Sequence, residues 1–196
     1  NDFSHTTAEW ESVIGLGIYG LRARISEYAS TNSENEYSKY FYEQLLRVYD
    51  ASLRFIKRVA EKAELCGRSE MAAGLWNLTK GAPADLYEAL QTSIVYYYLQ
   101  HFFDGTFLRT MGRLDRLFYP YYVREDKTRA DRMLLDYVKE IDTLEAPANI
   151  PFALGIQLTR YTEDGLVLNF WSDKLLEIFN KNGIKGSFHL NSGNIY

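Results

Sequence analysis

The segment from residue 83 to residue 103 restricts most strongly how this chain can fold. Its apolar residues lie at helical spacing and occupy every side of the predicted helix: Leu90 and Ile94 share one face, while Val95 and Tyr98 lie on others. A helix that is apolar all round is normally a buried helix. We therefore expect this helix to be central, with the rest of the chain packed around it.

Four further segments carry apolar residues at helical spacing. They predict helices over about residues 10–28, 41–66, 70–78 and 128–144. Capping residues are predicted at three helix ends: Thr6 with Glu9, Thr128 with Asp131, and Gly67 as a left-handed cap. Three glycines inside the first helical pattern are expected to allow close helix packing, namely Gly15, Gly17 and Gly20.

The pattern changes near the C-terminal end of the chain. "IPFALG" at residues 150–155 and "KGSFHL" at residues 185–190 are typical of strands, with a helical pattern between them. We therefore expect a β-α-β unit in residues 147–196, after a helical region in residues 1–146. A chain of 196 residues is long enough for one domain with a substantial core.

Composition and charge exclude several classes of protein. A formal net charge of −4 argues against a general nucleic-acid binder, which needs excess Lys and Arg to neutralise phosphates. The single cysteine excludes an internal disulfide framework and suits a reducing cytoplasm. No apolar run approaches the roughly 20 residues of a membrane span. We expect a cytoplasmic protein that binds neither nucleic acid nor membrane.

Few residues show the spacing of a catalytic or metal site. Cys66 ends an apolar stripe and has no histidine near it in sequence, so we expect a buried packing residue. The three histidines, His5, His101 and His189, are far apart and form no metal-binding motif. We therefore expect no metal ion.

The segment "TMGRLDRLFYPYY" at residues 110–122 combines a glycine, two arginines flanking an aspartate and an aromatic-proline-aromatic run. A surface helix does not require this combination. Gly112 permits close backbone approach, and Arg113 and Arg116 can each pair with Asp115. Two interpretations are open. These residues either lock a helix end against the preceding helix or contact a substrate.

Several motifs in order resemble those of the glycyl radical enzymes, the group that contains pyruvate formate-lyase and its dehydratase and lyase relatives. The matching segments are "SHTTAEWESVIGLGIYGL", "EMAAGLWNL", "APADLYEALQTSIVYYYLQHFFDG" and "RTMGRLDRLFYPYY". The resemblance implies a fold that is mainly α with a small α/β part. This fold would be a helical layer plus the first strands of an incomplete α/β barrel.

The resemblance also implies where a substrate would lie. The loop Asp104–Arg109 would border the substrate cavity, with Asp104, Leu108 and Arg109 as candidate residues. His5 matches the histidine of the family's "HTT" motif and is a further candidate. Apolar Phe107 and Leu108 stand where dehydratase relatives offer a polar side chain, which argues against a polyol substrate.

The last matching segment, "RTMGRLDRLFYPYY", has an implied structural role. Gly112, Arg113 and Asp115 would hold the helical layer against the barrel. On this interpretation the segment at residues 110–122 supports the site and does not react.

Two motifs of the resembled family do not occur in this chain. The family stores a radical on a glycine in a segment resembling "RVSGY" and passes it to a cysteine at the tip of a barrel loop. We therefore expect an N-terminal fragment of such an enzyme, inactive alone, with no catalytic residue of its own. The parent would cleave C–C, C–O or C–N bonds in a small metabolite under anaerobic conditions, as a lyase, acyltransferase or dehydratase. A separate activating enzyme, with S-adenosylmethionine and an iron–sulfur cluster, would install the radical.

Two alternative functions remain open. In every case, unpaired strands could allow the chain to self-associate. The chain could be a short non-catalytic homologue that serves as a binding or scaffold protein. It could also be a self-contained helical enzyme that uses His5 or Cys66.

Overall fold

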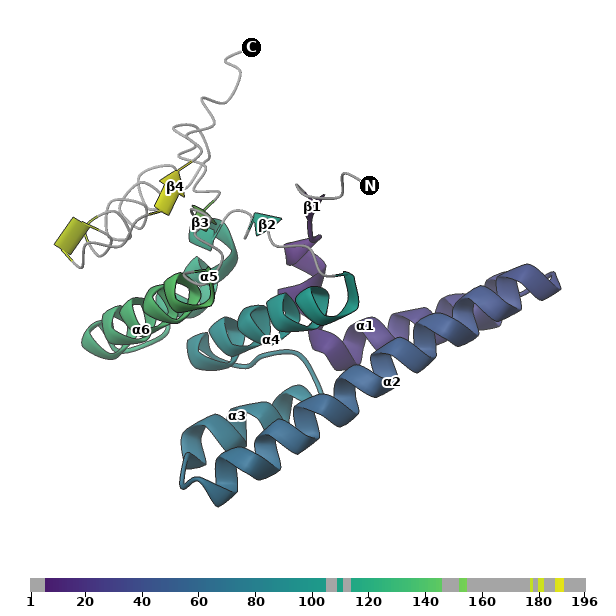
Figure 1. The fold of residues 1–196 in the computed structure, drawn as a ribbon, viewed down its shortest axis with the longest axis horizontal. Coiled ribbons are helices and arrows are strands. Elements are labelled where there is room, and N and C mark those ends of the chain that lie inside the picture. The colour runs from purple at the N-terminus through teal and green to yellow at the C-terminus, as the bar shows by residue number, and fades with distance from the viewer. Residues whose placement is uncertain are drawn as a thin grey trace, which may run out of the picture. The chain divides into compact units, whose positions relative to one another are not determined.

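The computed structural model describes residues 6–104, 109–110, 114–145, 152–154, 177, 180–181 and 186–188. The helices are α1 (Trp10–Asn32), α2 (Glu36–Leu65), α3 (Ser69–Leu78), α4 (Leu86–Asp104), α5 (Leu114–Tyr122) and α6 (Lys127–Glu145) (Figure 1). The strands are β1 (Thr6–Thr7), β2 (Arg109–Thr110), β3 (Phe152–Leu154) and β4 (Gly186–Phe188). Two compact units make up the chain: a helical unit, Glu11–Leu99, and a terminal unit, Asn1–Trp10 with Gln100–Tyr196.

The core of the helical unit draws on all four of its helices. Its buried cluster contains Ile18 of α1, Ile56 and Ala60 of α2, Leu75 of α3, and Val95 and Leu99 of α4. In α4, every residue from Leu86 to Leu99 is buried or half-buried. The expectation that this segment is buried is therefore confirmed for Leu86–Leu99. It was wrong at the C-terminal end of the helix, where Phe102 and Phe103 are exposed.

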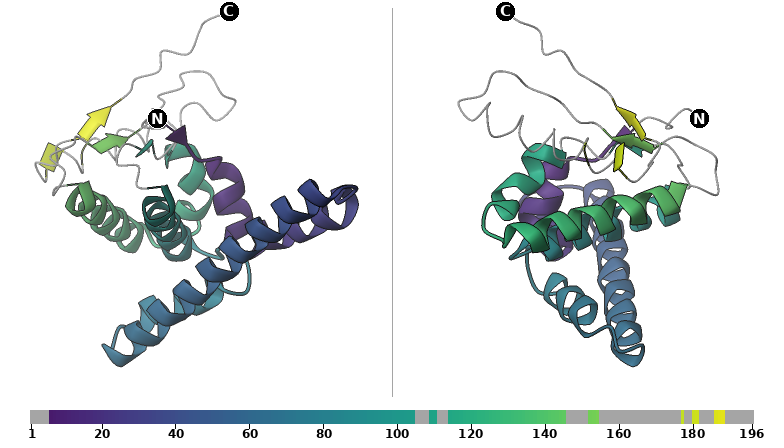
Figure 2. Two further views of the ribbon diagram at one scale, coloured as in Figure 1. Left: turned by 45° about the vertical axis from the view of Figure 1, so that its right-hand side comes forward. Right: turned by 90° about the vertical axis from the view of Figure 1, so that its left-hand side faces the viewer.

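Helices α1 and α2 form an antiparallel hairpin, and α3 lies alongside the C-terminal part of α2 (Figures 1 and 2). The Arg22 guanidinium donates a 2.9 Å hydrogen bond from Nε to Asp50 Oδ1, which joins α1 to α2. This hydrogen bond raises the pKa of Arg22 above its usual value. Because both side chains are partly exposed, the ion pair orients the hairpin more than it stabilises it.

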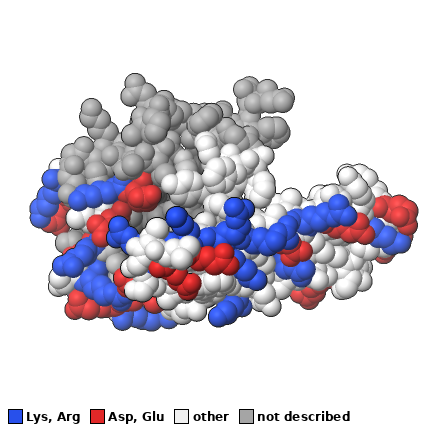
Figure 3. Space-filling model, turned by 60° about the horizontal axis from the view of Figure 1, so that its bottom comes forward, with Lys and Arg blue, Asp and Glu red and all other residues white. Residues whose placement is uncertain are grey.

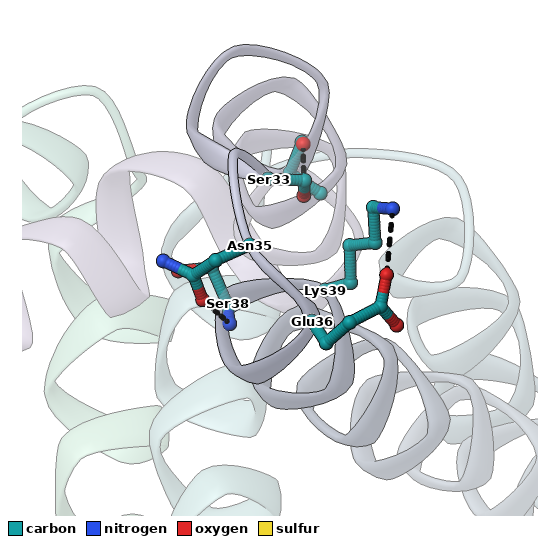
Figure 4. Close-up of polar contacts among 6 residues, drawn as sticks. Ser33, Asn35, Glu36, Ser38 and Lys39 are labelled. Atoms are coloured by element: carbon teal, nitrogen blue, oxygen red, sulfur yellow. Dashed lines mark hydrogen bonds and ion pairs between the residues drawn. The ribbon is translucent and has the colours of Figure 1, made fainter.

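The turn between α1 and α2 is closed by local polar contacts (Figure 4). Asn35 caps α2 by accepting a 2.9 Å hydrogen bond at Oδ1 from the Ser38 backbone N–H. Ser33 Oγ donates to the carbonyl oxygen of Ala29 in the last turns of α1. Capping of this kind satisfies backbone groups that the helix ends leave without partners.

Helix α2 ends where the sequence predicts, but the prediction for its cysteine was wrong. Gly67 adopts φ +70°, which confirms the left-handed cap. Cys66 is free and exposed, so the expectation of a buried packing cysteine was wrong. The apolar stripe stops at the buried Ala63, and the last residues before the cap turn to solvent.

Helix α1 is interrupted at Gly17, which has φ 64° and ψ 174°. This combination lies in a region that is essentially restricted to glycine. A Cβ atom at this position would come within 2.8 Å of the Gly81 carbonyl oxygen and 3.1 Å of Ala82 Cα. Close packing is present at Gly17, but against the loop that leads into α4 and not against another helix. At Gly20 the atoms nearest to an added Cβ belong to Leu16 of the same helix. The expectation of close packing is wrong at Gly15, whose added Cβ would meet nothing within 4 Å.

Buried polar groups between α3 and α4 are largely satisfied. The Glu88 carboxylate accepts hydrogen bonds from Asn77 Nδ2 at 2.7 Å and from the Ala84 backbone N–H at 2.8 Å. The Glu88 N–H in turn donates to Asp85 Oδ1 at 2.9 Å. This reciprocal arrangement resembles a capping box and ties the start of α4 to α3.

The terminal unit contains α5, α6 and the four short strands. Helices α5 and α6 meet through an edge-to-face contact between Phe118 and Tyr137, whose ring centroids are 5.7 Å apart. Strand β1 pairs with β2, and β3 pairs with β4, each pair being parallel. Strands are therefore present in both predicted strand segments, "IPFALG" and "KGSFHL". The helix expected between them falls almost wholly outside the described residues.

The predicted fold class needs correction. We expected the first strands of an α/β barrel, but the described strands are only two or three residues long and form two separate pairs. A strand of three residues spans about 10 Å, and barrel closure requires a continuous ring of paired strands. The described part of the chain is thus mainly α, without a barrel.

A first prediction concerns the interruption of α1. Replacing Gly17 by Ala should lower the free energy of unfolding by at least about 1–3 kcal/mol, because the backbone conformation there is strained for any other residue. The added methyl group would also collide with the Gly81 carbonyl. Urea titration followed by circular dichroism measures the change.

Gly15→Ala is the matched control in the same helix. Its backbone is not left-handed and its surroundings are open. It should therefore leave stability unchanged or raise it by about 0.5–1 kcal/mol. Equal losses in both variants would show that the contact at Gly17 is unimportant.

Candidate functional site

Strands β1 and β2 bring together two segments that lie about a hundred residues apart in the sequence. Thr6 is the register partner of Arg109, and Thr7 is that of Thr110. The capping box expected at Thr6 and Glu9 is therefore wrong, since Thr6 belongs to a strand. The pairing connects the "HTT" segment to the end of the loop that follows α4, and both had been identified as candidate substrate segments.

The candidate cavity residues lie close to this pairing in the sequence. Asp104 is the last residue of α4, and Arg109 is the first residue of β2. His5 and Leu108 lie outside the described residues, although each adjoins a strand residue, Thr6 or Arg109 respectively. The contact of these four residues with a substrate stays a prediction.

The predicted structural motif is described only in part. Asp115 lies in the first turn of α5, whereas Gly112 and Arg113 lie outside the described residues. The ion pairs expected among Arg113, Asp115 and Arg116 therefore stay predictions.

Residues later in the same segment anchor α5 to α6. The Tyr122 hydroxyl donates a 2.9 Å hydrogen bond to Asp131 Oδ1. Burial, together with the hydrogen bond to Asp131 and the negative charge of that carboxylate, raises the pKa of Tyr122 to about 12. Burial likewise raises the pKa of Tyr121, while the Arg124 guanidinium 5.6 Å above the ring acts to lower it. The end of the "YPYY" run is thus architectural.

The contact between Tyr122 and Asp131 could not be found from the sequence. Asp131 had been assigned to a helix cap with Thr128, but Asp126 caps α6 through a 2.9 Å hydrogen bond from the Arg129 N–H. Residues nine apart on two helices leave no periodic signal. The sequence analysis therefore identified both Tyr122 and Asp131 as structural residues but could not predict that they contact each other.

Two other polar side chains of the helical unit, Glu88 and Gln91, have structural roles. The Glu88 carboxylate is held by Asn77 and Ala84 in the interior of the helical unit. Gln91 donates from Nε2 to the Met71 carbonyl oxygen at 3.0 Å, while its buried Oε1 lacks a hydrogen-bond partner among the described residues. That oxygen packs against Gly74, where an added Cβ would lie 2.3 Å from it.

The described residues contain no group of three or more His, Cys, Asp or Glu side chains that could hold a metal ion. No described helix combines the length and the apolar character that a membrane crossing requires.

Comparison with known families identifies the chain. The model of a family described as pyruvate formate lyase-like matches residues 1–141. The chain belongs to this pyruvate formate lyase-like family, which confirms the resemblance seen in its motifs. The match includes β1, β2 and the whole segment at residues 110–122. No curated protein matches the chain in sequence.

A second prediction concerns pH and Tyr122. An unfolded tyrosine loses its proton near pH 10, whereas folded Tyr122 keeps its proton until about pH 12. The stabilisation by Tyr122 is therefore complete below pH 10 and is lost as the pH rises toward 12. Tyr122→Phe should lower stability by about 0.5–1.5 kcal/mol at pH 7, because a buried hydrogen bond is lost. This difference should shrink above pH 10.

Urea unfolding at a series of pH values measures both effects. Tyr28→Phe, at a half-exposed position of α1, is the control and should follow the unmodified chain. A stability difference for Tyr122→Phe that stays constant from pH 7 to pH 11.5 would refute the assignment.

A third prediction tests the pairing of β1 with β2. Thr6→Cys with Arg109→Cys, made in a Cys66→Ser background, should form a disulfide under mild oxidation. Adjacent strands lie about 4.8 Å apart, which is within the Cα separation that a disulfide spans. Mass spectrometry of non-reduced peptides detects the bond.

The control pair is Thr6→Cys with Thr110→Cys. Successive positions of a strand face opposite sides, so these cysteines should cross-link poorly. Equal yields for the two pairs would contradict the register.

Proposed function

We propose that this chain is the N-terminal part of a glycyl radical enzyme and forms one wall of its substrate cavity. The complete protein would cleave a C–C, C–O or C–N bond of a small metabolite in the anaerobic cytoplasm. The part described by this sequence would bind and orient the substrate. Alone, it would be inactive.

One combination of observations supports this proposal most strongly. The family match covers residues 1–141, and within it the parallel pairing of β1 and β2 joins the two segments that carry the cavity candidates. His5 adjoins Thr6, and Thr6 is the register partner of Arg109. Candidates from opposite ends of the helical region therefore belong to one small backbone unit.

The residue types favour one class of substrate. Arg109 carries a permanent charge on a guanidinium, a group that binds carboxylates in a two-pronged geometry. Phe107 and Leu108 are apolar and offer no hydrogen bond to hydroxyl groups. A small metabolite with an anionic group beside an apolar part suits this set better than a polyol does.

The residues of this chain do not fit the radical chemistry itself. Cys66 is exposed at the end of α2, and Gly67 serves as the left-handed cap of that helix. Neither position resembles a cysteine inside a barrel or a glycine that stores a radical. In our proposal both groups belong to another part of the protein, and the separate activating enzyme supplies the S-adenosylmethionine and iron–sulfur chemistry. Gly112, Arg113 and Asp115 would support the wall.

A second candidate is a non-catalytic homologue with a binding or scaffold role. The observation that favours it is a set of exposed aromatic residues at the turn between α1 and α2, namely Tyr28, Tyr37, Tyr40 and Phe41, with 50%, 79%, 63% and 48% of their surface exposed. Exposed apolar surface of this kind can mark an interaction site.

A fourth prediction distinguishes the two candidates. The complete product of the native gene is produced without oxygen and incubated with an activating enzyme, S-adenosylmethionine and a reductant. Electron paramagnetic resonance should then detect a glycyl radical. The chain of 196 residues treated in the same way should show none, because it lacks the radical segment.

Reading the coding DNA beyond the codon for Tyr196 provides the control. A downstream cysteine loop and an "RVxGY"-like segment are required for the radical to form. A gene that ends directly after Tyr196, or a complete protein without a radical, would exclude the enzyme and favour the scaffold. A radical in the short chain would contradict both candidates.

A further inference from the structure

Helix α1 bends at Gly17, the non-helical residue that joins a first segment, residues 10–16, to a second segment, residues 18–32. Figures 1 and 2 show the first turns of α1 running at a steep angle to the long remainder of the helix. Val13 and Ile14 are 3% exposed, so apolar burial holds the first segment against the helical unit. Because apolar burial is not directional, the angle of the bend depends on other contacts.

One polar contact crosses the bend. Arg24 Nη1, in the second segment, donates a 3.1 Å hydrogen bond to Ser12 Oγ in the first segment. In a straight helix, residues twelve positions apart are separated by roughly 18 Å along the axis. An arginine and a serine side chain cannot bridge that distance. The hydrogen bond between Arg24 and Ser12 therefore requires the bent form of α1.

The surroundings of Arg24 differ from those of a surface cation. Figure 3 shows many Lys and Arg side chains spread over the surface, with acidic side chains among them. Arg24 is half-buried and lies near Tyr49. Burial raises the pKa of Tyr49, while a hydrogen bond with Tyr96 and the positive charge of Arg24 act to lower it. Tyr49 of α2 and Tyr96 of α4 both pack against the buried core cluster. Arg24 is thus held beside the core of the helical unit.

The bend determines where the chain continues toward the candidate site. Strand β1 ends at Thr7, and only Ala8 and Glu9 separate it from the first residue of α1. A connection of two residues leaves little freedom between the first segment and β1. The direction of the first segment therefore restricts where β1 can lie.

We propose that Arg24 is a positioning residue for the candidate site. By holding Ser12 across the bend, it fixes the direction in which the chain runs between α1 and β1. The bracing of the bend is a property of the helical unit alone. Its importance for a substrate rests on the proposed function, in which β1 and the neighbouring His5 belong to the cavity wall.

Hydrogen exchange of the 196-residue chain, followed by mass spectrometry, tests the bracing. The first segment has seven residues, too few to remain helical once it is released. Ser12→Ala and Arg24→Ala should each speed amide exchange in residues 14–16 roughly three- to tenfold, the factor by which loss of one hydrogen bond shifts an opening equilibrium. The double variant should exchange no faster than Arg24→Ala, because both changes remove the same contact.

Arg22→Ala is the matched control. It removes a cation from the second segment together with its 2.9 Å ion pair to Asp50, but this pair joins α1 to α2 and does not cross the bend. It should leave exchange in residues 14–16 unchanged. Residues 90–97 of α4 serve as an internal reference, because a general loss of stability would speed exchange there as well.

A second measurement connects the bend to the candidate site. In the chain with Thr6→Cys, Arg109→Cys and Cys66→Ser, adding Ser12→Ala should lower the yield of the disulfide after a short, fixed oxidation. Without the hydrogen bond, β1 samples more directions, so the effective concentration of one cysteine near the other falls. Adding Arg22→Ala should leave the yield unchanged. Circular dichroism verifies folding, and Ser12→Ala, which removes a single hydroxyl group, keeps the test valid if Arg24→Ala does not fold.

Two sets of results would overturn the proposal. The bracing is refuted if exchange in residues 14–16 is unchanged in Ser12→Ala, or if it speeds equally in Arg22→Ala or in residues 90–97. Faster exchange with an unchanged disulfide yield refutes the positioning role. Neither result bears on the radical chemistry, and a complete protein without a glycyl radical would exclude the enzyme while leaving the bracing intact.

Discussion

The burial of helix α4 is the constraint on which the helical unit depends. Its first four turns are covered by α1, α2 and α3. The loop before α4 must therefore lead the chain into the space between these three helices. This loop packs directly against Gly17. At Gly17 the backbone of α1 has a conformation that only glycine adopts easily. Inside, Glu88 satisfies polar groups from both α3 and the loop. Helix packing, loop entry and buried polarity are thus parts of one arrangement.

Local patterns in the sequence predicted most of this unit. Apolar spacing located the helices, and Gly67 marked the end of α2 because a left-handed cap has a local residue requirement. The interruption at Gly17 had no local signal, since it results from contact with residues more than sixty positions away. Cys66 was misplaced for a related reason: a periodic stripe indicates which face is apolar but not where neighbouring helices stop covering it.

The candidate site was predictable only through resemblance. The motifs placed His5 and Arg109 in one family pattern, but no periodicity connects Thr6 with a strand a hundred residues later. The barrel was over-predicted because short strand-like runs carry no information on how many partners they will find. The pairing of Tyr122 with Asp131 was missed because it depends on how two helices meet. Contacts between elements, more than the elements themselves, were beyond the reach of the sequence.

The division of the chain has a consequence for the order in which it is built. The helical unit is one continuous stretch, whereas β1 must wait for β2. A ribosome adding about 5–20 residues per second needs on the order of 5–20 s to reach Arg109 after Thr7. Helical domains rich in local contacts fold in microseconds to milliseconds. Contacts within the continuous helical unit therefore form ahead of the pairing of β1 with β2, which has to bring together two segments about a hundred residues apart.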